Sequence, residues 1–270
     1  MSNENSANKN GISESNSEQK KECVKEFLVS DKFKPMIEEV FISVKKVLAQ
    51  RKQNLTDWTS IDEEEFIRIF GINKDVEIQS KYSARNETEK RIEKVKAREF
   101  MLSGINRFIE ICNNISVENR TCVNGENLYG NFLNYTHITP GSARIESTQT
   151  LGCTPKGDDE EIEKYYGNTK VMVRRKSYKD KLRIEILHNF LNKPLWGHDS
   201  KVSTLCHELS HLCRYGVDNE SYGGMGTLDL PTVDFDPDFN YEKFAAELVG
   251  NPEVFKNSYN IERYFEIKVK

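Results

Sequence analysis

Cysteine is scarce in this sequence, and long apolar runs are missing from it. Only 6 of the 270 residues are cysteine and no two form a Cys-x-x-Cys pair, which excludes a disulfide-rich scaffold and a zinc site built from such pairs. A membrane-spanning helix needs about 18 or more consecutive apolar residues, and no stretch approaches that length. We therefore expect a globular protein with no membrane partner.

An excess of charge of one sign is also missing. The chain has 39 Lys and Arg against 43 Asp and Glu, a net charge of -4, and the basic residues are scattered. Nucleic-acid binding requires a basic stripe or patch, so we expect no nucleic-acid partner. The amino terminus lacks the basic and apolar regions of a secretory signal peptide. We expect a cytoplasmic protein or one exported by a specialised secretion system.

Histidine is rare too, with 5 residues, yet two of them share one motif. Residues 207–211 read His-Glu-x-x-His inside an apolar, helix-compatible run. Helix positions four apart lie about 40° apart around the axis, so His207 and His211 can present two imidazoles to one zinc ion. Glu208 follows the first ligand and can take a proton from a water at the metal. The same helix carries an apolar stripe of Val202, Leu205, Leu209 and Leu212. This combination predicts the active-site helix of a zinc metalloprotease.

The third zinc ligand has two candidates. A metzincin would place a glycine and then a third ligand where this chain has Arg214 and Val217, so that layout fails. Glycines at 223, 224 and 226 allow the backbone to turn sharply and return the carboxylate of Asp229 to the helix. A gluzincin would instead use a downstream glutamate, for which Glu247 is the candidate. We favour Asp229 and keep Glu247 as the alternative.

Apolar periodicity predicts the helices of the chain. They are expected over residues 35–48, 60–70, 86–113, 241–249 and 260–266, besides the motif helix. Ser60 and Glu63 form a capping-box pattern at the start of the second helix, and Gly71 is its expected stop.

The remaining segments are predicted to be strands, loops or disordered. β-branched residues in near alternation predict strands over 169–174 and 182–187, joined as a hairpin through a turn at 177–181. Residues 1–21 have almost no apolar side chains, which predicts a disordered tail. His188 and His198 flank the loop before the motif helix, and we interpret them as structural or solvent-facing rather than as ligands.

Further short motifs accompany the His-Glu-x-x-His helix. They are Ile184-Glu185-Ile186-Leu187 with Phe190, Asp199-Ser200, Thr204-Leu205, Gly226-Thr227-Leu228-Asp229, Asn251-Pro252, Asn257 and Tyr264-Phe265. With these motifs the chain resembles the aspzincins, the deuterolysin and peptidyl-Lys metalloendopeptidase group of zinc proteases. The resemblance covers about residues 65 to 265. It implies that His207, His211 and Asp229 bind zinc and that Glu208 is the general base.

The chain departs from this family at the last two positions of the motif. The family continues Gly-Thr-x-Asp-x-x-Tyr-Gly, with a tyrosine that hydrogen-bonds the oxyanion, whereas this chain has Thr232 and Val233 at the last two positions. Loss of an oxyanion donor typically lowers the rate by about 10²- to 10³-fold. Tyr222 and Tyr241 are the candidates for a replacement donor.

Taken together, these features predict an α+β protein with a zincin-like metalloprotease domain over residues 65–270, containing a small antiparallel sheet and the motif helix. A helical region over 22–64 and the tail precede it. We expect a monomeric zinc endopeptidase that acts on a protein or peptide substrate, with Zn²⁺ as its cofactor, and interpret it as a delivered effector or toxin. The alternatives are a non-catalytic zinc-containing binding protein of the same fold and a binding domain without metal.

Overall fold

The computed structural model describes most of the chain in separate ranges. These are residues 32–81, 92–118, 120–123, 126–134, 136, 141–145, 160–166, 169–175, 183–212, 227–231 and 239–269. Helices and small sheets combine in them, so the predicted α+β class is confirmed. The tail predicted over residues 1–21 and the turn predicted at 177–181 lie outside the described residues. Among the described helices, none is both long and apolar enough to cross a membrane.

The first two helices follow from their apolar spacing and their ends. Helix α1 spans Phe33–Asp57, longer than predicted, and buries its apolar side at Ile37, Val40, Val44 and Leu48. Helix α2 spans Ser60–Phe70 and begins with a capping box, one residue earlier than predicted, formed by Thr59 and Asp62. It ends at Gly71 as predicted, with φ of 67°. A Cβ atom at this position would lie 2.4 Å from a backbone nitrogen, so only glycine fits.

The single helix predicted over 86–113 is wrong in its first part. Strand β2, Ile92–Lys96, pairs antiparallel with β1, Glu77–Lys81, and helix α3 begins only after it, at Ala97–Asn114. Ile78 lies opposite Val95 in this ribbon, and the Ala97 N–H donates to the Val76 carbonyl at 2.9 Å. The helical pattern of residues 92–96 therefore yields to pairing with a strand that local periodicity does not reveal.

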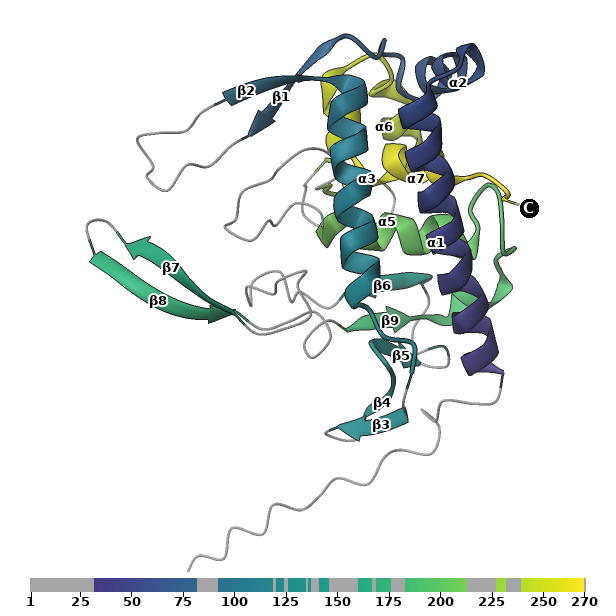
Figure 1. Cartoon of the computed structure of the whole chain (residues 1–270). Coiled ribbons are helices and arrows are strands. Elements are labelled where there is room, and N and C mark those ends of the chain that lie inside the picture. The colour runs from purple at the N-terminus through teal and green to yellow at the C-terminus, as the bar shows by residue number, and fades with distance from the viewer. Residues whose placement is uncertain are drawn as a thin grey trace, which may run out of the picture.

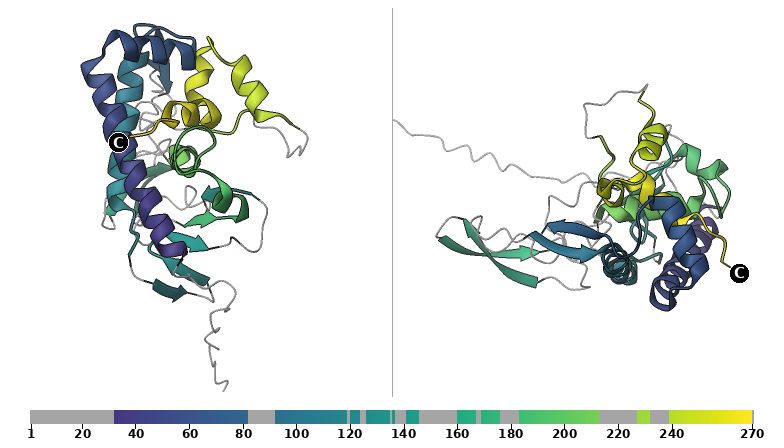
Figure 2. Two further views of the ribbon diagram at one scale, coloured as in Figure 1. Left: turned by 90° about the vertical axis from the view of Figure 1, so that its right-hand side faces the viewer. Right: turned by 90° about the horizontal axis from the view of Figure 1, so that it is seen from above.

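The central sheet has five strands in the order β3-β4-β5-β9-β6. Their bounds are Arg120–Val123, Glu126–Tyr129, Phe132–Asn134, Ile184–Ile186 and Ala143–Ile145. Strands β5 and β9 are parallel, so the sheet is mixed rather than antiparallel as predicted. The predicted hairpin of 169–174 with 182–187 is also wrong. Strand β8, Thr169–Arg175, pairs instead with β7, Glu160–Tyr166, in a ribbon that projects away from the helices (Figures 1 and 2). Strand β9 is buried along its whole length, which suits a central position between two neighbours.

Helix α5, Lys201–Leu212, carries the His-Glu-x-x-His motif and runs across α1 and α3, which lie side by side (Figure 1). Three residues of its predicted stripe, Val202, Leu205 and Leu209, are fully inaccessible to solvent. The other side of α5 faces α7, Ser258–Phe265, and the edge strand β6. The motif helix is thus held between the helices and the sheet.

The carboxy-terminal elements are anchored to the first two helices. After α6, Tyr241–Glu247, and the 3₁₀ helix η5, Pro252–Lys256, the chain enters α7. The guanidinium of Arg51 is buried, donates to the Tyr264 carbonyl at 2.5 Å, and pairs with Glu65 at 2.6 and 3.0 Å. Phe70 packs against Phe255 with ring centroids 4.7 Å apart. These contacts fix α7, which faces the motif helix.

Candidate metal centre

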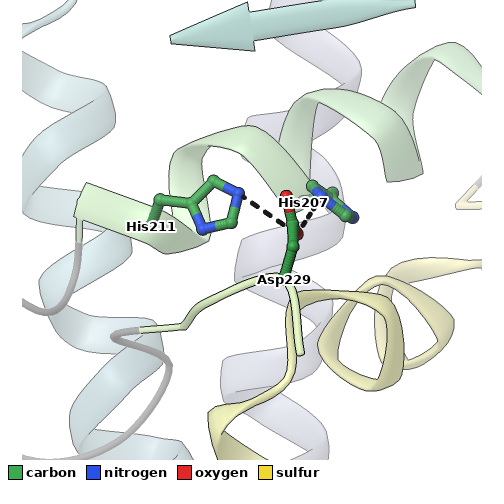
Figure 3. Close-up of side chains that lie close together, drawn as sticks. All are labelled: His207, His211 and Asp229. Atoms are coloured by element: carbon green, nitrogen blue, oxygen red, sulfur yellow. Dashed lines mark ion pairs between the residues drawn. The ribbon is translucent and has the colours of Figure 1, made fainter. Parts of the chain in front are cut away.

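Two helix side chains and one loop side chain converge beside α5. His207 and His211 extend from one face of the helix because they are four residues apart, and Asp229 approaches them from residues 227–231 (Figure 3). The backbone around Asp229 is held on both sides. The Leu228 N–H donates to the Lys256 carbonyl at 2.9 Å, and the Leu228 carbonyl accepts from the Ser258 N–H at 3.0 Å. The carboxylate therefore comes from a paired segment rather than from an unsupported turn.

The spacing of the three donors suits a single metal ion. The Nε2 atoms of His207 and His211 lie 3.1 and 3.7 Å from Oδ1 of Asp229, and the donor atoms all lie within 4.8 Å of one another. Ligands of a tetrahedral zinc ion, with bonds of about 2.0–2.1 Å, are about 3.3 Å apart. Two imidazoles with one carboxylate are a zinc donor set, and the three side chains present here match it.

Each donor is oriented by a second contact. Nδ1 of His207 lies 2.9 Å from Oε2 of Glu262, and Nδ1 of His211 lies 3.2 Å from the Thr227 carbonyl. The hydroxyl of Ser258 donates to Asp229. A proton on each Nδ1 leaves Nε2 with its lone pair towards the centre, which is the arrangement that metal-binding histidines normally have.

The electrostatics of the site favour a positive charge at its centre. Burial alone would lower the pKa of His207, but hydrogen bonds to Asp229 and Glu262 and the charge of Glu208 raise it to about 10. Burial opposes ionisation of Asp229, yet its contacts with His207 hold the pKa of its carboxyl well below its usual range. The pKa of His211 is lowered, first by burial and then by the charge of His207. A proton or a metal cation can supply the charge that this cluster requires.

A cavity of about 260 Å³ opens beside the cluster. Its lining includes Thr204, His207 and Glu208 from α5, and Ser142 and Ala143 from the edge of the sheet. Glu208 therefore faces the same space as one of the three donors. A bound peptide segment could reach the centre from this cavity.

Helix α7 contributes a tyrosine to the same cavity. The ring of Tyr259 meets the ring of His207 edge to face, with centroids 4.8 Å apart, and stacks on Tyr241 at 5.3 Å with an interplanar angle of 19°. Burial, followed by the nearby carboxylates of Asp229, Glu262 and Glu208, raises the pKa of the Tyr259 hydroxyl. The Tyr259 phenol therefore lies close enough to Asp229, Glu262 and Glu208 to interact with them electrostatically.

The structure places the other candidates of the sequence analysis as follows. Tyr241 lies on α6 and stacks on Tyr259, whose ring contacts His207, and Tyr222 lies outside the described residues. Glu247, the alternative third ligand, is exposed at the end of α6 and is not in the metal-compatible group. His188 contacts the Thr136 carbonyl at 2.9 Å. His198 lies 2.8 Å from Oε1 of Glu266, and both line the cavity.

Sequence reasoning missed three residues that surround the donors. Ser258, Tyr259 and Glu262 all lie on α7, close to Asp229 or His207. Ser258 and Glu262 are four residues apart, so they share a helix face, and this polar spacing was the available signal.

Comparisons with known proteins show likeness to solved structures. No protein-family model matches the chain, and no curated protein matches it. Among solved structures, it is similar to a zinc peptidase from Grifola frondosa, with 14% sequence identity and a TM-score of 0.46 over 88% of this chain and 96% of the other. This similarity does not assign the chain to a family.

Proposed function

We propose that this protein is a zinc-dependent endopeptidase that hydrolyses peptide bonds in proteins. The proposal depends on one observation: His207, His211 and Asp229 present a zinc-compatible donor set beside a cavity that Glu208 also lines. A metal site that only stabilised the fold would be closed by a fourth protein ligand, whereas a catalytic zinc site keeps one position open. In the described residues the group contains three protein donors.

In this proposal Glu208 moves the protons. His207, His211 and Asp229 would hold the zinc ion, which when bound would acidify a water and polarise a carbonyl oxygen. Glu208 takes the proton from the attacking water and then delivers it to the leaving amine nitrogen. Its place next to His207 on the rigid helix α5 keeps the carboxylate close to the centre throughout this transfer. Glu262 and the Thr227 carbonyl keep the two imidazoles in one orientation meanwhile.

The edge of the sheet offers a way to hold an extended substrate. Strand β6 is the terminal strand of the five-stranded sheet in the described residues, and it pairs on one side with β9. Ala143, the first residue of β6, and Ser142 immediately before it line the cavity. A peptide added as a further strand along this edge would bring its backbone past Glu208 with little dependence on its side chains. This supports a protein or peptide substrate.

Elemental analysis and peptide cleavage together test the proposal. We expect the wild type to hold about one zinc ion per chain and to cleave a mixed peptide library. Glu208→Gln should retain zinc and lose about 10²- to 10⁴-fold in rate, since only the proton carrier is removed. Asp229→Ala should lose the metal because one of three ligands is gone. Glu242→Gln is the matched control, because this exposed glutamate also lines the cavity but lies outside the donor group.

The outcomes separate the proposal from its alternatives. A wild type that holds zinc but shows no turnover, even after long incubation with folded proteins as well as peptides, would favour the non-catalytic zinc-containing binding protein. A wild type that binds no zinc would contradict the metal site itself. Equal loss of activity in Glu208→Gln and Glu242→Gln would argue against a specific role for Glu208.

A further inference from the structure

Tyr259 lies where the proposed reaction requires a hydrogen-bond donor. When water attacks a peptide carbonyl, negative charge develops on the carbonyl oxygen, and a positioned hydrogen-bond donor lowers the barrier to this step. The cavity beside the donors is lined by one tyrosine, Tyr259, together with Glu208 and His207. In the described residues this phenol is the tyrosine whose ring contacts a member of the donor group.

We propose that Tyr259 is a catalytic residue whose hydroxyl donates a hydrogen bond to the oxyanion of the scissile carbonyl. The inference rests on the proposed function and deepens it by naming the transition-state donor. No proton changes place in this step, because the phenol keeps its hydrogen while Glu208 carries the transferred proton. An unperturbed phenol has a pKa of about 10 and is therefore a donor at neutral pH.

The fold holds Tyr259 in a defined position. Its ring contacts two aromatic partners, His207 at 4.8 Å edge to face and Tyr241 at 5.3 Å in a stack. It lies in the first turn of α7, one residue after Ser258, which contacts Asp229, and three before Glu262, which contacts His207. A hydroxyl carried by the helix that orients two of the donors has a fixed distance to the centre, as oxyanion stabilisation requires.

Tyr241 is the internal comparison for this role. It stacks on Tyr259 and has the same hydroxyl, but the residues that line the cavity include Tyr259 and not Tyr241. Removing the Tyr241 hydroxyl should therefore leave the reaction unchanged. Phenylalanine at either position keeps the ring and its stacking, so the two variants differ in which hydroxyl is missing.

The experiment compares Tyr259→Phe with Tyr241→Phe in the zinc-loaded protein. For Tyr259→Phe we expect kcat to fall by about 10²- to 10³-fold with KM changed by less than about threefold. Zinc content should equal that of the wild type. Calorimetry supplies a readout independent of turnover: a phosphinic analogue of the best library peptide, which is tetrahedral like the transition state, should bind at least about tenfold more weakly. Tyr241→Phe should match the wild type in all three measurements.

Three results would overturn the inference. They are a Tyr259→Phe rate within about threefold of the wild type, an equal loss in Tyr241→Phe, and loss of zinc from Tyr259→Phe, which would make the residue a packing support for His207. Failure of the proposed function gives a different pattern. In that case the wild type and Glu208→Gln are equally inactive with zinc bound, and the inference falls with the proposal.

Discussion

The contact between Glu262 and His207 allows the most direct test of how the fold would prepare the candidate metal centre. Oε2 of Glu262 lies 2.9 Å from Nδ1 of His207, and Oε1 accepts from the Ser203 hydroxyl at 3.1 Å. The first contact fixes the ring orientation and adds negative charge behind the ligand, which strengthens the Nε2 donor. Glu262→Ala removes both effects and leaves the three donors in the chain.

The size of the effect follows from this geometry. A hydrogen bond to a charged group contributes about 1.5–3 kcal/mol, and about 1.4 kcal/mol corresponds to a factor of ten in affinity. We therefore expect Glu262→Ala to weaken zinc binding by about 10- to 100-fold, the range typical of residues that orient metal ligands. Glu262→Gln should lie between this variant and the wild type, because the amide oxygen still accepts from Nδ1 although the charge is gone.

Zinc affinity is measured by competition with a chelating dye of known affinity at constant pH. Glu266→Ala is the matched control, since Glu266 lines the same cavity and contacts His198 at 2.8 Å but lies outside the donor group. Thermal unfolding of the metal-free variants checks that α7 remains folded. An affinity of Glu262→Ala within about threefold of the wild type, or an equal loss in Glu266→Ala, would refute the orienting role.

Two further predictions concern pH and stability. Burial would lower the pKa of His207, but its contacts with Asp229 and Glu262 outweigh burial and raise this pKa to about 10. Protonation of His207 therefore stabilises the metal-free fold, and this stabilisation is fully present below about pH 6.5. It is lost as the pH rises towards about 10. Zinc must displace that proton, so its apparent affinity should rise by up to about tenfold per pH unit from about pH 6.5 to 8.5, and a pH-independent affinity in dye competition would contradict this. Separately, Glu65→Ala leaves the buried guanidinium of Arg51 without its counter-ion, and should lower the free energy of unfolding in urea by about 3 kcal/mol. Removal of the exposed Arg68, which also pairs with Glu65, should cost less than about 1 kcal/mol, and similar losses in the two variants would argue against the buried pair.

Helices and helix ends that depend on residues close together in the sequence were predictable. The motif helix and its buried stripe follow from spacings of three and four residues, and the end of α2 follows from Gly71. The capping box was displaced by one residue because Thr59 competes with Ser60 for the N-cap position. Local signals of this kind identify a helix more reliably than its boundary.

Strand partners were not predictable in the same way. Residues 92–96 have a pattern compatible with a helix, but they pair with β1, and the strands expected to form one hairpin belong to two separate sheets. A strand gains its stability from the neighbour that accepts its hydrogen bonds, and that neighbour can be any segment of suitable pattern. Periodicity within one segment carries no information about this choice.

The residues of the candidate site also fall into those predictable from local sequence and those brought together only by the tertiary structure. The sequence by itself determined that His207 and His211 share one helix face, because four residues make about one turn, and that Glu208 follows the first of them. It also limited the third ligand to two carboxylates. Only the tertiary structure decided that Asp229 lies beside the histidines while Glu247 is exposed at the end of α6, and that Glu262 and Tyr259 face His207. Glu262 lies 55 residues after His207 in the chain. Their proximity depends on the packing of α7 against α5, which is a property of the whole core rather than of any local pattern.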